Sequence, residues 1–77
     1  MITAAQCRMA RAALQWGIRD LAARSKVGVT TINRFEIGQS RPVNSTLTVL
    51  RQTLEAGGVE FLDEDGVRLT SQLNSEM

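Results

Sequence analysis

Histidine is missing from this chain, and cysteine occurs once, at Cys7. These gaps exclude zinc sites built from Cys and His, a disulfide framework and most catalysis by Ser-His or Cys-His pairs. A single unpaired cysteine suits a reducing compartment, and the sequence has no glycine-rich loop that could hold a phosphate. We therefore expect a protein that is not an enzyme, with no catalytic residues, no metal and no cofactor.

Long apolar segments are missing as well. No run approaches the roughly 20 residues that span a bilayer, and the first residues lack the basic-then-apolar pattern of a signal peptide. We expect a cytoplasmic protein without membrane contact. The 77 residues give room for one small domain with a marginal core.

The net charge of +1 hides a strong segregation of charge along the chain. Residues 1–51 contain eight basic and two acidic side chains, which is a net charge of +6. Residues 52–77 contain one basic and six acidic side chains, which is a net charge of −5. Such a distribution is typical of a chain whose first part faces a polyanion.

Capping residues and glycines divide the first 58 residues into helical segments. Thr3–Gln6 has the spacing of a capping box, Gly17 can cap a second helix, and Gly38 is a favoured stop. Apolar spacing places Cys7 in the core, and Trp16 joins the first two helices by packing in the core or at its boundary. The predicted helices are Ala4–Gln15, Ile18–Ser25, Val29–Glu36 and Ser45–Ala56.

The remaining residues change from helical spacing to alternation. Val59–Leu62 and Val67–Thr70 alternate apolar and polar residues around a turn at 63–66, which predicts a β-hairpin or two extended strands. We expect residues 1–58 to form a helical domain, residues 59–70 to form the hairpin, and residues 71–77 to form a flexible tail.

Two hairpin registers fit this pattern. A three-residue loop pairs Phe61 with Val67, whereas a tight Asp-Gly turn places Leu62 opposite Leu69. The sequence leaves this choice open. The acidic residues 63–65 have the chemistry of metal ligands, but without further spaced acids we interpret them as a solvated turn.

The segment from residue 16 to 38 reads W-G-I-R-D-L-A-A-R-S-K-V-G-V-T-T-I-N-R-F-E-I-G. It resembles the helix-turn-helix of small Cro/CI-type (XRE-like) transcriptional regulators of phages and bacteria. The resemblance covers about residues 3–62. The matching positions are Leu21-Ala22, Val27, Thr31-Ile32, Phe35-Glu36, Gly38, Thr46–Leu50 and Leu54–Phe61.

This resemblance implies a mainly α fold, a lambda-repressor-like four-helix DNA-binding domain, with the C-terminal β-hairpin or strand added. Two positions depart from the family pattern. Lys26 stands where a turn glycine is usual, so it must adopt a left-handed backbone at some cost. Gly28 stands where Ser or Thr often caps the recognition helix.

The resemblance places base-reading residues on the outward face of the helix 29–36. Arg34 is the leading candidate because an arginine can bind guanine through two hydrogen bonds. The alternatives are that Arg34 is a solvated surface arginine and that Val29 and Thr31 only begin the helix. The candidate base contacts are Val29, Thr30, Thr31, Asn33 and Arg34.

Phosphate contacts are expected from the start of the second helix and from the loop after the third, because free amides and basic side chains favour anions. The alternative is that Arg19 and Arg41 only make the surface soluble. The resemblance also pairs Arg11 with Glu36 as a structural ion pair. The candidate phosphate contacts are Gly17, Arg19, Gln39, Ser40, Arg41 and Asn44.

We therefore expect a sequence-specific transcriptional regulator, a repressor or autoregulator, that binds inverted-repeat double-stranded DNA as a homodimer through the helix 29–36 in the major groove. The alternative is a protein-interaction module on the same scaffold, such as an antitoxin or antiactivator, whose acidic C-terminal part binds a basic partner. The hairpin is the candidate dimer element, unless its apolar face only covers the chain's own core. Its candidate interface residues are Val59, Phe61, Leu62, Val67 and Leu69.

Overall fold

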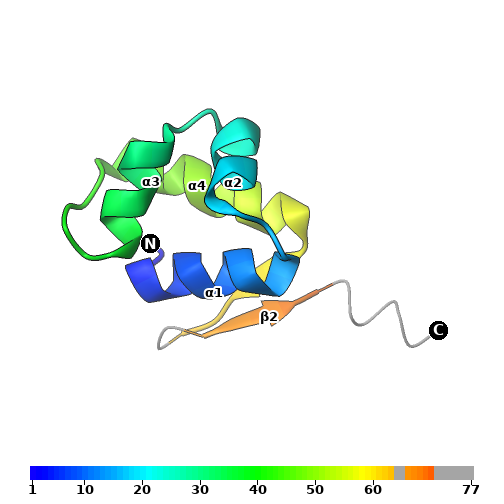
Figure 1. Cartoon of the computed structure of the whole chain (residues 1–77). Helices are drawn as coiled ribbons and strands as arrows, with labels where there is room; N and C mark the ends of the chain where they lie inside the picture. The colour runs from blue at the N-terminus through cyan, green and yellow to red at the C-terminus, as the bar shows by residue number, and fades with distance from the viewer. Residues whose placement is uncertain (64–65, 71–77) are drawn as a thin grey trace.

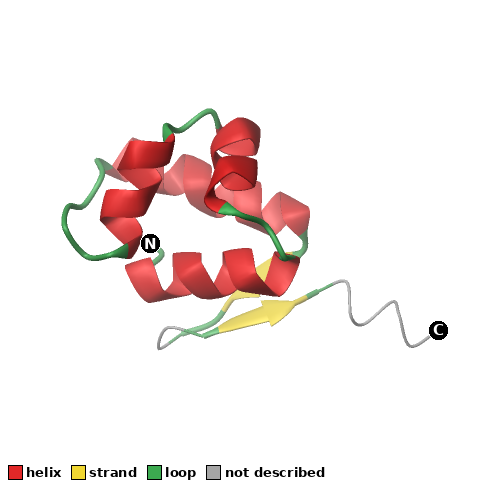
Figure 2. Cartoon of the chain, in the orientation of Figure 1, coloured by secondary structure: helices red, strands yellow, loops and turns green. Residues whose placement is uncertain are grey.

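Four helices are followed by a two-stranded antiparallel sheet in the computed structural model, which describes residues 1–63 and 66–70. The middle helices have the predicted bounds, while the first ends one residue early and the last begins one residue early and ends one late. Figures 1 and 2 show the arrangement. The elements are α1 (Ala4–Leu14), α2 (Ile18–Ser25), α3 (Val29–Glu36), α4 (Asn44–Gly57), β1 (Val59–Phe61) and β2 (Val67–Leu69).

The helix ends follow from local side-chain and backbone chemistry. Thr3 and Gln6 form the predicted capping box, each side chain accepting a hydrogen bond from the other's backbone N–H at 3.0 to 3.1 Å. Gly28 caps α3 with an extended backbone. Lys26 ends α2 in the left-handed region, at φ 66°, as the departure from glycine predicted. A turn of residues 26–28 therefore connects α2 to α3.

One hydrophobic core joins all four helices and the first strand. Cys7, Leu21 and Ile32 are fully buried, and α4 contributes a stripe at its i, i+3 and i+7 positions. Trp16 is half-buried against this core. The buried hydrophobic residues are Ile2, Cys7, Ala10, Leu21, Ile32, Phe35, Leu47, Leu50, Leu54 and Val59.

The hairpin adopts the register in which Phe61 pairs with Val67. The Leu62 amide donates to the Gly66 carbonyl at 2.9 Å, which closes a three-residue loop. On the outer face Glu60 and Arg68 stand opposite each other and form an ion pair. This pairing of opposite charges agrees with the register observed.

The inner face of the hairpin packs on the chain's own helices. Val59 is 2% exposed, and Phe61, Val67 and Leu69 are half-buried against the same core. In this structure these four residues cover the chain's own core, which is the alternative to a hairpin that forms a dimer. Leu62 alone among the five candidate dimer residues counts as exposed, at 38%.

The side chain of Gln6 ties the hairpin to α1. Its amide nitrogen donates to the carbonyls of Leu62 and Gly66, at 2.9 and 3.1 Å. In Figure 1 the hairpin and α3 lie on opposite sides of α1. Among the described residues, no helix combines the length and apolar character that a membrane crossing requires.

Candidate nucleic-acid interface

Side chains from three segments gather around one open hollow of about 580 Å³. The start of α2, the outward face of α3 and the loop after α3 all contribute. Seven of its eight lining residues are exposed, and Ile18 is half-buried. The lining residues are Gly17, Ile18, Arg19, Val29, Thr30, Asn33, Arg34 and Gln39.

The amphipathic sequence of α3 decides which side chains reach the hollow. Ile32, Phe35 and Glu36 are buried, so the residues at the opposite phase point outward. Four of the five candidate base contacts line the hollow, while Thr31 is exposed but lies outside it. The positions of the buried residues in the sequence of α3 therefore determine which face of the helix points toward the hollow.

The hollow is electropositive. Arg19 and Arg34 are its two charged lining residues, and no carboxylate lines it. Among the described residues, neither arginine forms an ion pair. The two guanidinium groups are therefore available to an anionic ligand.

One predicted anion donor is already occupied. The Gly17 amide donates to the carboxylate of Asp20 at 2.9 Å, at the start of α2. This contact satisfies one of the free amides of the helix terminus and places a negative charge there. A phosphate at this position would depend on the Arg19 side chain and on the remaining amides of the first turn.

The loop after α3 is divided between two hollows. Gln39 lines the electropositive hollow, whereas Ser40 and Arg41 line a neighbouring one with Thr3 and Phe35. The amides of Gln39 and Ser40 both donate to the Arg34 carbonyl, at 2.8 and 3.2 Å. Their backbone donors are thus used within the chain, and only their side chains remain for phosphates.

The last candidate phosphate contact stands apart from this group. Asn44 is exposed as the first residue of α4 and lines neither hollow, and Val43, not Asn44, is the residue that caps the helix. The acidic segment lies elsewhere too. Asp63 lines a separate small hollow with Gln6 and Arg51, away from Arg34, while positions 64 and 65 are outside the described residues.

Helix α1 holds the C-terminal end of α3 through Glu36, which is 3% exposed. Arg11 makes two parallel hydrogen bonds to its carboxylate, with Nε to Oε2 and Nη2 to Oε1 both at 2.8 Å. Arg11 also donates to the Trp16 carbonyl at 3.0 Å. These contacts link α1, the start of α2 and the end of α3.

Two further residues add to these contacts, which we call the α1–α3 tie, and no local pattern in the sequence predicts their part in it. The Cys7 thiol donates to Glu36 Oε2 at 3.2 Å, and Arg8 donates to the Glu36 backbone carbonyl. Burial, followed by the hydrogen bond to Glu36, raises the pKa of the Cys7 thiol well above its ordinary value. Cys7 therefore stays a neutral donor, which suits a structural contact to the carboxylate.

Comparison with known proteins gives no assignment for this arrangement. The chain matches no protein-family model and no curated protein. The site is therefore interpreted from its own residues: an exposed helix face, two unpaired arginines in the described part of the chain, and a buried tie that fixes the helix behind them.

Proposed function

We propose that the chain is a sequence-specific DNA-binding regulator with a lambda-repressor-like fold, in which α2 and α3 form a helix-turn-helix. The observation that carries this proposal is the electropositive hollow. Base-reading and phosphate-binding candidates from separate segments line it together, and no carboxylate lines it. The resemblance of residues 16–38 to Cro/CI-type regulators supports the same function.

The dimensions of α3 suit a major groove. An α-helix with its side chains is about 10–12 Å across, and the major groove of B-DNA is about 12 Å wide, so the exposed face of α3 can enter it. Val29 and Thr30 lie in the first turn, and Arg34 lies one turn further on. In this proposal Arg34 binds a guanine, Asn33 reaches a base or a phosphate, and Val29 contacts a thymine methyl group.

Arg19 and Gln39 both line the hollow beside α3. Arg19 belongs to α2, which precedes α3 in the sequence, and Gln39 belongs to the loop that follows α3. They contact phosphates on the proposed duplex and set the position of α3, but carry little sequence information. The Asp63 carboxylate lies away from this face, which avoids repulsion from the phosphates.

A single short helix reads too few base pairs for useful specificity, so the proposal includes a homodimer on an inverted repeat. The two α3 helices would enter successive major grooves, about 34 Å apart. Because the hairpin's apolar residues cover its own core, a hairpin-mediated dimer has to use Leu62 and the strand edges.

The test is selection of duplexes from a random-sequence DNA pool by the full chain, followed by mobility-shift titration at two salt concentrations. We expect an enriched inverted repeat whose affinity falls steeply with salt. Arg34→Gln should lose about 1–3 kcal/mol of binding free energy for the selected duplex, and should relax specificity at one base pair of each half-site. Arg19→Gln should weaken binding to all sequences about equally and reduce the salt slope by about 1.

Arg24→Gln is the matched control, because Arg24 is also exposed and on the same pair of helices but lines a different hollow. Its affinity for the selected duplex should stay close to that of the parent chain. Failure to enrich any sequence, or an unchanged affinity and specificity in Arg34→Gln, would overturn the proposal.

A further inference from the structure

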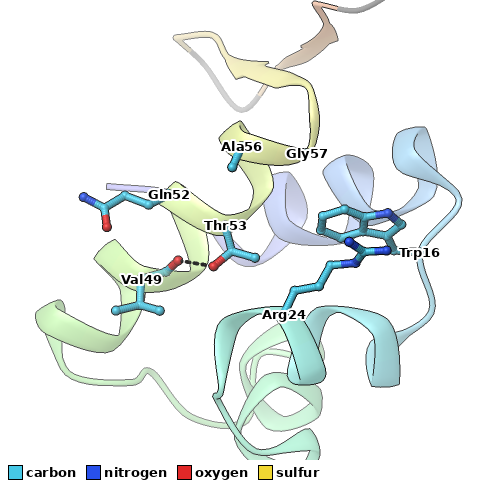
Figure 3. Close-up of a pocket in the computed structure, with 7 residues that line it drawn as sticks. All are labelled: Trp16, Arg24, Val49, Gln52, Thr53, Ala56 and Gly57. Carbon is cyan, nitrogen blue, oxygen red and sulfur yellow. Dashed lines mark hydrogen bonds between the residues drawn. The ribbon is translucent and has the colours of Figure 1, made fainter.

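A second open hollow, of about 380 Å³, lies between α2 and α4 (Figure 3). Helix α4 contributes five residues at i, i+3, i+4, i+7 and i+8, which form one face of the helix. Residues 19 and 24 are about 140° apart around the axis of α2, so this hollow opens on a different side from the electropositive one. We call it the α2–α4 groove, and its lining residues are Trp16, Arg24, Val49, Gln52, Thr53, Ala56 and Gly57.

The groove has a preformed aromatic platform. The Arg24 guanidinium carbon lies 4.3 Å from the centre of the Trp16 ring. Figure 3 shows the two side chains next to each other. On α4 the ring packs so closely on Gly57 that a Cβ there would be 2.5 Å from Trp16 Cη2. Both side chains are therefore held in place before any ligand binds, which reduces the entropy lost on binding.

The positive charge of the groove has no counterpart among the described residues. Arg24 is its single charged lining residue and forms no ion pair within that part of the chain. The carboxylates of the two helices are engaged elsewhere, Asp20 with the Gly17 amide and Glu55 with Arg51. An acidic ligand would therefore meet an oriented guanidinium and no competing carboxylate.

Apart from the exposed side chain of Gln52, the remaining lining is largely apolar or already hydrogen-bonded within the chain. Val49 is 39% exposed, and Ala56 and Gly57 leave the end of the groove open. The Thr53 hydroxyl donates to the Val49 carbonyl at 2.8 Å, so its proton is used within α4. A bulky apolar side chain could thus be buried beside Trp16 without leaving the Thr53 hydroxyl unpaired.

We propose that the α2–α4 groove binds an acidic segment of a partner protein, with a carboxylate on Arg24 and a neighbouring apolar side chain between Val49 and Trp16. The proposal is independent of the DNA-binding function. Because Arg19 and Arg24 project from different sides of α2, the segment leaves the electropositive hollow open.

The test is selection of short random peptides, displayed on phage, by the immobilised full chain in the absence of DNA. We expect enriched peptides in which Asp or Glu stands beside Leu, Ile or Phe. A synthetic peptide of the enriched sequence is then titrated calorimetrically. Arg24→Gln should weaken its binding about ten-fold or more, whereas the matched variant Arg34→Gln should bind it as the parent does.

A second measurement changes the peptide and leaves the protein unaltered, so it does not depend on how a variant folds. Replacing the acidic residue of the selected peptide by its amide should weaken binding to the parent chain by a similar factor. The proposal is overturned if no sequence is enriched, if the enriched peptides are basic or neutral, or if both changes leave the affinity unaltered. Self-association of the parent chain that Arg24→Gln abolishes would make a second copy the occupant and would also overturn it.

Discussion

The packing of the Trp16 ring explains why residue 57 is a glycine. An added Cβ would lie 2.5 and 2.7 Å from Trp16 Cη2 and Cζ2, closer than such atoms approach. Gly57 is the last residue of α4, where helix propensity alone would favour alanine over glycine. The close packing of Trp16 therefore outweighs helix propensity at this position.

Gly57→Ala is expected to destabilise the chain by about 1–3 kcal/mol, because the Trp16 ring has to move out of its packed position. Urea unfolding followed by circular dichroism measures the loss. Gly28→Ala is the control, since a Cβ there meets nothing within 4 Å, and it should cost about 1 kcal/mol or less. A Gly57→Ala variant as stable as the parent would contradict this account of Trp16.

At the scale of elements, the tie between α1 and α3 determines how α3 is held. Glu36 is the last residue of α3, and α1 contacts it through Arg8 and Arg11 as well as Cys7. The Arg11 guanidinium makes two hydrogen bonds to its carboxylate and is itself mostly buried. A buried pair of this kind adds little net stability, but losing one partner leaves the other charge uncompensated.

Glu36→Gln should therefore cost about 3–5 kcal/mol in unfolding free energy and lower affinity for the selected duplex at the same time. Thermal unfolding and mobility-shift titration measure the two effects. Glu60→Gln removes a carboxylate from the exposed pair with Arg68 and should change stability by about 1 kcal/mol or less. An unchanged melting temperature in Glu36→Gln would show that the tie does not hold α3.

Much of the element order could be predicted because its signals are local. The capping box at Thr3 and the left-handed residue at Lys26 both act within a few residues of the helix ends they define. Contacts between distant residues could not be predicted this way. Gln6 reaches a hairpin loop 56 to 60 residues away, and no periodicity in the sequence encodes that contact.

For the candidate site too, the features set by local sequence could be predicted and those set by tertiary packing could not. The outward phase of α3 placed Asn33 and Arg34 on one face from the sequence alone, and both line the hollow with Arg19. Thr31 and Asn44 lie outside it, because membership depends on how the helices pack and not on sequence proximity. The α2–α4 groove could not be predicted, since the sequence indicates only core or boundary packing for Trp16.

At the scale of the whole molecule, α3 and the hairpin lie on opposite sides of α1 (Figure 1). The two unpaired arginines of the electropositive hollow lie on α2 and α3, and in Figure 1 the hairpin is on the other side of α1. Two copies could thus meet away from the electropositive hollow. The exposed side chain on the hairpin that is large and apolar is Leu62.

We expect sedimentation equilibrium of the full chain to give a dimer, and Leu62→Lys to shift it toward the monomer without loss of helical circular dichroism. Met9→Lys is the matched control, because Met9 on α1 is 39% exposed and Leu62 is 38% exposed. A monomer at all concentrations would refute the homodimer. A dimer that Leu62→Lys leaves unchanged would place the interface outside the hairpin.

The hairpin's place in the core also bears on when the helices can fold during synthesis. Val59 fills the core between helices made earlier, and the loop that Gln6 binds follows it. Since domains fold as units and translation proceeds from the N-terminus, α1 lacks these contacts until residues 59–66 have left the ribosome. A nascent chain arrested before that point would therefore have its helical sequences but an incomplete core, and would depend on chaperones to avoid aggregation.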